Sequence, residues 1–270
     1  MNSLELFSLK DKAAIVTGAL GLIGKNYCFA LSEAGANIIV CDLNEKECVE
    51  FAKSLPTESI GIGVDITDKS SVENLRDKTV QHFGKIDILV NNAAINDMFE
   101  NPQTAAEQSM FENYPLELWQ KSLDVNVTGT FLCSQIIGKE MAKAGKGSII
   151  NIASTYGLVG PDQSIYKKPD GSQPFYKSPA YPTTKGAIIN FTRYLAAYWG
   201  NKGVRVNTLT PGGVKNNQEE FFVNNYSEKT PLGRMAYPTD YKGAIIFLAS
   251  DASSYMTGAN LIIDGGWTAW

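Results

Sequence analysis

Residues 13–24 read Ala13-Ala14-Ile15-Val16-Thr17-Gly18-Ala19-Leu20-Gly21-Leu22-Ile23-Gly24, and this stretch decides which fold the chain implies. The apolar run 13–17 predicts a strand, and the apolar periodicity of 22–34 predicts a helix. The glycine-rich turn between them lets backbone N–H groups and the helix N-terminus face a pyrophosphate without interference from a Cβ atom. The glycines could instead only permit tight packing of the strand against the helix.

An acidic residue closes the next predicted strand. Residues 37–40 are mostly apolar, and Asp42 follows 18 residues after Gly24. A carboxylate at this place can accept hydrogen bonds from the ribose of the adenosine, and it repels a 2′-phosphate. Asp42 could instead cap a helix that begins near Glu45. Together, the glycine turn and Asp42 favour a dinucleotide site that prefers NAD to NADP.

The alternation of strand and helix continues to the end of the chain. Further strands are expected at 60–64, 86–90, 147–152, 204–209 and 260–263, and further helices at 69–83, 116–144, 181–199, 218–226 and 241–249. This order predicts a single α/β domain over 1–270, a Rossmann-type doubly wound parallel sheet of about seven strands with helices on both faces. Ligands are expected at the carboxyl ends of the strands.

Two polar segments interrupt this pattern. Residues 95–114 are expected to be irregular, with Pro102 and Pro115 as breakers, and 156–180 is rich in Pro, Gly, Tyr and Lys. Long loops in compact domains are usually functional or disordered. Both would lie at the strand ends beside the active site, and their polar side chains suit a hydroxylated substrate. They could instead form a contact between subunits.

The predicted helix 116–144 contains Asn126 in the run Val-Asn-Val-Thr-Gly. Asn and Gly both lower helix stability, so their presence indicates a local distortion or a role.

A tyrosine and a lysine stand four residues apart in Tyr181-Pro182-Thr183-Thr184-Lys185. On a helix the two side chains share a face. Free Tyr titrates near pH ~10, so proton transfer near pH ~7 requires about 4 kcal/mol of stabilisation of the phenolate. One cation ~4 Å away supplies at most that amount, and burial opposes it. Lys185 therefore needs a second cation, such as an oxidised nicotinamide, and a hydrogen bond to help it.

The composition excludes several classes of protein. Of the 270 residues, 44% are hydrophobic and 19% charged, which is typical of a globular protein. A net charge of −4 without a basic run argues against a nucleic-acid or membrane-surface partner. The first residues do not resemble a signal peptide, and no apolar run is long enough to cross a bilayer.

The cysteines and the histidine indicate neither disulfides nor metal. The cysteines are scattered without a Cys-x-x-Cys pair, and Cys28 and Cys133 fall in apolar helical patterns as core residues. A reducing cytoplasm fits this usage best. The only histidine, His82, is expected at the surface and not as a ligand, and no metal site is predicted.

Taken together, these motifs resemble the short-chain dehydrogenase/reductase superfamily over almost the whole chain. The resemblance rests on the glycine turn 18–24, Asp65, Asn91-Asn92-Ala93, Asn126, Ser154, Tyr181 with Lys185, Pro211-Gly212, 231–234, 247–251, Thr257-Gly258 and 264–266. It implies a cytoplasmic NAD-dependent oxidoreductase, often a homotetramer or dimer, that acts on a small molecule.

The resemblance also implies a role for each site residue. Tyr181 would exchange a proton with the substrate oxygen, and Ser154 would hydrogen-bond that oxygen. Lys185 would hold the nicotinamide ribose and depress the pKa of Tyr181, while Asn126 would help to hold a relay water. Asp65 and Asn92 would line the adenine and ribose, and Val214 the nicotinamide carboxamide. The full set implied for the cofactor is Gly18, Gly21, Leu22, Ile23, Gly24, Asp42, Leu43, Asp65, Ile66, Asn92, Ala93, Ala94, Tyr181, Lys185, Pro211, Gly212 and Val214.

Three features depart from the family pattern. The turn reads Thr-Gly-x-x-Gly-x-x-Gly, where compact members usually place the middle glycine at the position of Leu22. Ala94 stands where the family usually has a glycine. Ser154 and Tyr181 are 27 residues apart, wider than the family norm. The inserted loop holds Tyr166 and Tyr176, but neither has a lysine four residues later, so Tyr181 keeps the role.

The insertion favours a sugar, polyol or sugar derivative as substrate, because Ser-Thr-Tyr-Gly-Leu-Val-Gly-Pro with Ile165-Tyr166 resembles a bacterial subgroup named for flagellin modification and linked to surface sugars. Three alternatives remain. A 3-oxoacyl reductase is disfavoured by the polar insertions and Asp42. An NAD-retaining epimerase or dehydratase shares the glycine spacing, but such members have a longer region after the equivalent of Asp264. A non-catalytic dinucleotide-binding protein would not need Asn126, Ser154, Tyr181 and Lys185.

Overall fold

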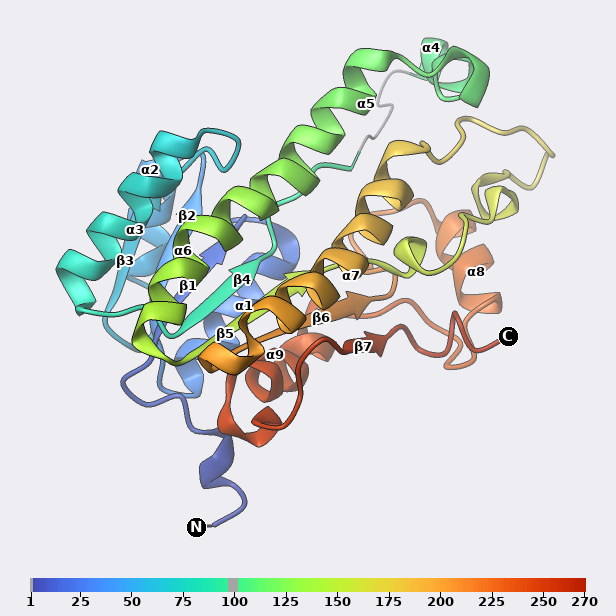
Figure 1. The fold of residues 1–270 in the computed structure, drawn as a ribbon. Helices are drawn as coiled ribbons and strands as arrows, with labels where there is room; N and C mark the ends of the chain where they lie inside the picture. The colour runs from blue at the N-terminus through green and yellow to red at the C-terminus, as the bar shows by residue number, and fades with distance from the viewer. Residues whose placement is uncertain (1, 97–101) are drawn as a thin grey trace.

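The computed structural model describes residues 2–96 and 102–270, which form one seven-stranded parallel sheet (Figure 1). The strand order is β3-β2-β1-β4-β5-β6-β7, and each neighbouring pair is parallel. The strands are β1 Ala13–Thr17, β2 Asn37–Asp42, β3 Ser59–Gly63, β4 Ile88–Asn91, β5 Gly147–Ile152, β6 Val204–Pro211 and β7 Asn260–Ile263. The predicted doubly wound parallel sheet is confirmed.

The direction of winding reverses between β1 and β4. Strands β2 and β3 follow β1 toward one edge of the sheet, and β5, β6 and β7 follow β4 toward the other. In open α/β sheets ligands bind outside the carboxyl ends of the strands at such a reversal. The glycine turn leaves β1 at this place, and Asn91 ends β4 beside it.

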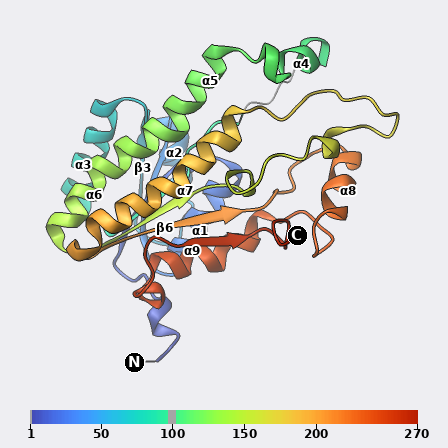
Figure 2. The same ribbon diagram turned by 45° about the vertical axis from the view of Figure 1, so that its right-hand side comes forward.

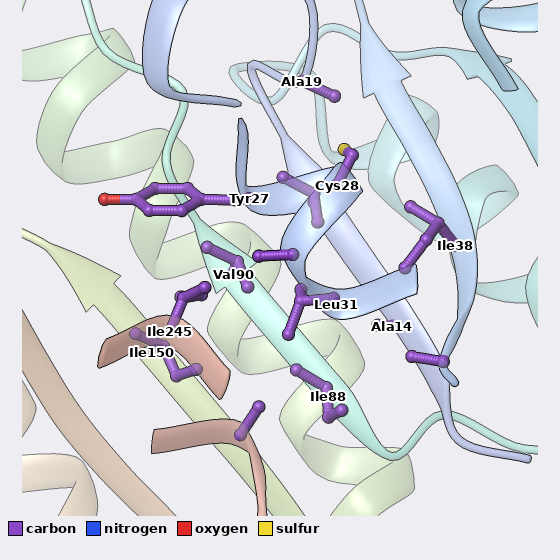
Figure 3. Close-up of a cluster of buried hydrophobic side chains, with 14 of the residues drawn as sticks. Ala14, Ala19, Tyr27, Cys28, Leu31, Ile38, Ile88, Val90, Ile150 and Ile245 are labelled. Atoms are coloured by element: carbon purple, nitrogen blue, oxygen red, sulfur yellow. The ribbon is translucent and has the colours of Figure 1, made fainter. Parts of the chain in front are cut away.

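Helices cover both faces and enclose two apolar cores. One core lies beneath α1 (Leu22–Glu33), α2 (Glu45–Ala52) and α9 (Lys242–Ala249), and the other beneath α3 (Lys69–Phe83), α6 (Thr130–Ala144) and α7 (Ala180–Trp199). Figure 3 shows the first core, where Tyr27, Leu31 and Ile245 from the helices lie over Ile38, Val90 and Ile150 from the strands. Cys28 and Cys133 are buried as predicted, and so are Cys41 and Cys48.

The predicted element boundaries agree with the structure to within about two residues, and α3 shows why. Asp68 caps its N-terminus by accepting from the N–H of Ser70, and Gly84 ends it with φ 72°. His82, in the last turn of α3, is exposed, and its Nε2 lies 2.9 Å from Oε1 of Glu58. Within the described ranges, no helix is long and apolar enough to span a membrane.

A π-helical turn divides the helix predicted at 116–144. It separates α5 (Leu116–Leu123) from α6 and covers Asp124–Gly129, which includes Asn126. The predicted distortion is therefore confirmed. A Cβ atom on Gly129 would lie 2.5 Å from Cδ1 of Ile66, so the turn also packs tightly against the segment after β3.

The prolines of segment 95–114 led us to expect an irregular chain, but part of the segment is helical. Pro102 begins a helix, α4 (Pro102–Gln108), and a 3₁₀ turn follows at Phe111–Asn113. A proline at the first helical position loses no hydrogen bond, because the N–H there has no intrahelical partner. Residues 97–101 of this segment lie outside the described part of the chain.

The segment 156–180 is largely irregular, as predicted, and packs on α8 (Glu220–Glu228). Ile165 and Tyr166 share a buried apolar cluster with Tyr226 of α8 and with Trp267. The N–H of Tyr176 donates to Oγ of Ser109 at 2.8 Å, which joins this segment to the end of α4. Figures 1 and 2 show α4, this segment and α8 on the side toward which β6 and β7 point.

Candidate active site

The glycine turn after β1 is shaped by close backbone contacts. Gly18 has φ 61°, and a Cβ atom there would lie 2.7 Å from Cα of Ala93. A Cβ atom on Gly24 would lie 2.2 Å from the carbonyl oxygen of Gly18. Gly21 is the N-cap of α1 and provides no side-chain cap, so the positive end of the helix dipole is not neutralised by a side chain. This cradle, which a Cβ atom would fill, fits a pyrophosphate.

Asp42 holds the end of β2 to this turn. Its Oδ2 accepts from the N–H of Leu20 at 3.0 Å, and its Oδ1 accepts from the N–H of Leu43 at 2.8 Å. Asn44, not Asp42, caps α2, because its Oδ1 accepts from the N–H of Glu47 at 3.2 Å. The alternative that Asp42 is a helix cap is therefore wrong.

The segment after β4 closes the other side of the turn. Nδ2 of Asn92 donates to the carbonyl oxygens of Thr17 and Gly18 at 3.0 and 2.9 Å. The N–H groups of Asn92 and Ala93 both donate to Oγ1 of Thr17 at 3.1 Å. Nδ2 of the buried Asn91 donates to Oδ1 of Asn151 on β5 at 2.8 Å. The side chains of these two asparagines thus tie β4 and the segment after it to the neighbouring strands β5 and β1.

The remaining residues assigned to the adenosine side lie after β2 and β3. Leu43 is exposed beside Asp42. The exposed Asp65 accepts from the N–H and Oγ1 of Thr67 at 2.9 and 2.7 Å through its Oδ1. Ile66 is buried against Gly129.

Ser154 and Tyr181 meet at the carboxyl end of β5. Ser154 follows β5 directly, and its Oγ accepts from the N–H of Tyr156 at 3.2 Å. Tyr181 lies in the first turn of α7. Burial raises the pKa of the Tyr181 phenol, and a hydrogen bond with the Ser154 side chain lowers it by less. Desolvation thus opposes ionisation of the phenol, as expected, and the depressed pKa expected with Lys185 and a bound nicotinamide stays a prediction.

Lys185 lies one helical turn after Tyr181. It is 4% exposed, and its Nζ donates to the carbonyl oxygen of Ile152 at 2.8 Å. The same Nζ lies 5.6 Å from the centre of the Tyr181 ring. Burial lowers the pKa of Lys185 from 10.5 to about 8, so the ammonium is held at a cost.

Asn126 connects this end of α7 to the segment after β4. Its Oδ1 accepts from the N–H of Ile95 at 2.8 Å, and its Nδ2 donates to the carbonyl oxygen of Ile95 and to Oγ1 of Thr184, each at 3.0 Å. Both amide hydrogens are thus used within the protein, and Asn126 fixes the geometry between two segments of the site.

The residues assigned to the nicotinamide side lie at the end of β6 and directly after it. A Cβ atom on Gly212 would lie 2.8 Å from Cα of Asp264, and the carbonyl oxygen of Gly212 accepts from Oη of Tyr241 at 3.2 Å. Val214 forms a parallel bridge with Ala236. Pro211 is the last residue of β6.

Two further features of the site were not found from the sequence, and both belong to the segment 156–180. Nζ of Lys177 lies 4.8 Å from the centre of the Tyr181 ring. Oη of Tyr156 lies 2.9 Å from Oη of Tyr166, and both side chains are close enough to Tyr181 to interact with it electrostatically. No periodicity relates these positions to α7, so only the folded path of the segment brings them together.

This chain is similar to known oxidoreductases in both sequence and structure. Residues 18–268 match a family model described as "Enoyl-(Acyl carrier protein) reductase". The chain is 35% identical to a D-threitol dehydrogenase of Mycolicibacterium smegmatis, covering 97% of this chain and 95% of that protein. It is 33% identical to an NAD-dependent glycerol dehydrogenase of Listeria innocua, covering 97% and 96%. A solved gluconate 5-dehydrogenase from Burkholderia cenocepacia, in complex with NADP and tartrate, superposes with a TM-score of 0.85 at 28% identity over all of both chains.

Proposed function

This chain belongs to the short-chain dehydrogenase/reductase family, and we propose that it is an NAD-dependent dehydrogenase of a sugar, polyol or sugar derivative. As a member of this family it is an oxidoreductase that acts on CH–OH groups with a dinucleotide cofactor. The observation that carries the proposal is that Tyr181 lies against Ser154, and that Lys185, one helical turn later on α7, places its Nζ 5.6 Å from the centre of the Tyr181 ring.

The chain's own residues handle the proton. In the oxidation direction Tyr181 removes the proton of the substrate hydroxyl, and Ser154 hydrogen-bonds the same oxygen. The bound nicotinamide supplies the hydride chemistry and a positive charge. Lys185 holds the nicotinamide ribose, and Asn126 would help to hold a relay water, sharing an oxygen with it because both N–H groups of its side-chain amide are occupied.

We assign the cofactor to the glycine turn after β1 and to the segments at the ends of the neighbouring strands. Gly18, Gly21, Leu22, Ile23 and Gly24 would bind the pyrophosphate, while Leu43, Asp65, Ile66, Asn92, Ala93 and Ala94 would line the adenosine side and Pro211, Gly212 and Val214 the nicotinamide. Asp42 supports NAD, because its carboxylate stands where a 2′-phosphate would be repelled. The glycerol dehydrogenase relative is NAD-dependent, whereas the solved gluconate 5-dehydrogenase holds NADP.

The substrate class rests on the relatives and on the two polar segments. The D-threitol and glycerol dehydrogenases act on small polyols, as their names state. We assign 95–114 and 156–180 to substrate recognition within a single domain, supported by their contact at Ser109 and Tyr176. The resemblance to flagellin-modification proteins remains a prediction and would extend the substrates to activated sugars.

An exposed aromatic stripe supports a homo-oligomer. Tyr194 and Tyr198 on α7 are 61% and 55% exposed and stack at 6.0 Å between ring centres, and Phe131 of α6 lies at the same groove. We propose that this face pairs with a second copy, as a dimer or tetramer in the cytoplasm. Large exposed apolar faces commonly mark such contacts.

The proposal is tested by screening purified protein for NAD reduction across polyols, sugars, sugar acids and activated sugars, and repeating each hit with NADP. Turnover of a polyol or sugar with NAD supports it. Turnover of 3-oxoacyl substrates alone would make the protein a 3-oxoacyl reductase. NAD that stays bound without net reduction would favour an epimerase or dehydratase, and NAD binding without any turnover would favour a binding protein.

A further inference from the structure

Two ammonium groups, not one, lie against the Tyr181 ring. Nζ of Lys177 is 4.8 Å from the ring centre, which is closer than Nζ of Lys185 at 5.6 Å. Lys177 stands four residues before Tyr181 but outside α7, which begins at Ala180. The inserted segment 156–180 therefore contributes a cation to the proposed proton-transfer group.

The side-chain amide of Gln163 holds the main chain at Lys177 through both its N–H and its carbonyl oxygen. Its N–H donates to Oε1 of Gln163 at 2.8 Å, and its carbonyl oxygen accepts from Nε2 of Gln163 at 3.2 Å. Its Nζ donates to Oδ1 of Asn96. Lys177 thus links the segment after β4 to the inserted segment across Tyr181.

Lys185 and Lys177 differ in how much hydration their ammonium groups lose beside Tyr181. Burial lowers the pKa of Lys185 to about 8, so the charge of this ammonium is maintained against the cost of desolvation. Lys177 is only partly buried, so less of its hydration is lost. The phenols of Tyr156 and Tyr166 also lie near Tyr181, and burial raises the pKa of both, so they stay neutral and supply no charge to offset a phenolate.

We propose that Lys177 is a positioning residue of the reaction, which orients the Tyr181 ring and stabilises its ionised form. This inference rests on the proposed role of Tyr181. A cation within about 6 Å of an aromatic ring is attracted to its face, and it favours a negative charge on the attached oxygen. The insertion would then set the acidity of the phenol as well as the shape of the substrate site.

The first test is the pH dependence of kcat/KM for oxidation of the best neutral polyol. Lys177→Met keeps the length of the side chain and removes its charge, whereas Lys177→Arg keeps the charge. Lys167→Met is the matched control, since Lys167 is exposed in the same segment. Loss of a nearby cation raises the pKa of the phenol, so the acidic limb of the profile should move up by about one unit in Lys177→Met and the rate at a pH on that limb should fall about tenfold.

Lys177→Arg should restore the wild-type limb, and Lys167→Met should not move it. An unchanged limb in Lys177→Met, a rate lowered equally at every pH, or an equal shift in Lys167→Met would overturn the proposal.

A second test needs no substrate. The absorbance of tyrosinate is titrated with pH in the wild-type protein, in Lys177→Met and in Tyr181→Phe, with NAD⁺ present. The signal missing from Tyr181→Phe reports Tyr181, and its midpoint should lie about one unit higher in Lys177→Met. An equal midpoint would overturn the inference. A shifted midpoint in a protein that turns over no substrate would uphold it while the proposed function failed.

Discussion

Nδ2 of Asn126 donates to Oγ1 of Thr184 at 3.0 Å, and this bond joins the π-helical turn to the helix that carries Tyr181 and Lys185. Thr184 in turn donates to the carbonyl oxygen of Tyr181 at 2.8 Å. A residue that lowers helix stability is thus retained at a buried position where it fixes the geometry between elements far apart in sequence.

Asn126→Ala should lower the free energy of unfolding by about 3 kcal/mol, because it leaves the N–H and C=O of Ile95 without their side-chain partner. Thr184→Val removes one hydroxyl, which accepts from Nδ2 of Asn126 and donates to the carbonyl oxygen of Tyr181, and should cost less, about 2 kcal/mol. Urea denaturation of both variants checks this order. Equal losses would mean that Asn126 does not organise the segment after β4.

Gly24→Ala should lower the free energy of unfolding by about 2 kcal/mol, because its Cβ would lie 2.2 Å from the carbonyl oxygen of Gly18 and backbone must shift. At Gly21 the nearest atom is 3.3 Å away, so Gly21→Ala should cost less, about 1 kcal/mol, most of it from placing alanine at the N-cap of α1. Both should weaken NAD binding, measured by calorimetry. A Gly24→Ala protein as stable as wild type would contradict the tight packing of the turn.

Asp42→Ala should reduce the preference for NAD over NADP by about tenfold or more, since it removes the charge that repels a 2′-phosphate. The control is Asn44→Ala, which removes the cap of α2 and should cost about 1 kcal/mol of stability without changing the preference. The measurement is the ratio of kcat/KM with NAD to kcat/KM with NADP in each variant. An unchanged ratio in Asp42→Ala would leave Asp42 only its hydrogen bonds to Leu20 and Leu43.

Lys185→Met should stabilise the cofactor-free protein below pH 8 while removing activity. Burial lowers the pKa of Lys185 from 10.5 to about 8, so between these values the unfolded chain binds more protons and the stability of wild type rises with pH. Below pH 8 the folded protein carries the whole penalty, which is roughly 3 kcal/mol, less about 1 for the bond to Ile152. Denaturation curves should therefore show Lys185→Met to be more stable than wild type at pH 7, and the two proteins should have similar free energies of unfolding at pH 10. A difference that does not depend on pH would contradict the account, and exposed Lys46→Met is the control.

The features that could be predicted from the sequence are those with a local cause. The start of α3 follows from Asp68 and its end from Gly84, and both act within one turn. The distortion at Asn126 could be predicted because Asn and Gly disfavour a regular helix. Its partner Ile95 could not, because the two residues meet only through the fold.

The features that were missed depend on context. Pro102 breaks a helix in its interior but can begin one, and the sequence around it does not distinguish the two cases. Lys177 reaches Tyr181 through a segment without periodicity, held by Gln163. The direction in which burial shifts the pKa of Tyr181 could be predicted, but the extent of that burial depends on the fold.

The most direct test of the central claim is turnover of Tyr181→Phe, with NAD binding measured on the same preparation. The account predicts that oxidation of the substrate found in the screen is abolished while the Kd for NAD stays within about threefold of wild type, because the phenol acts on the proton and not on cofactor affinity. Substantial residual turnover in this variant would contradict the assignment of Tyr181 as the proton-transfer group.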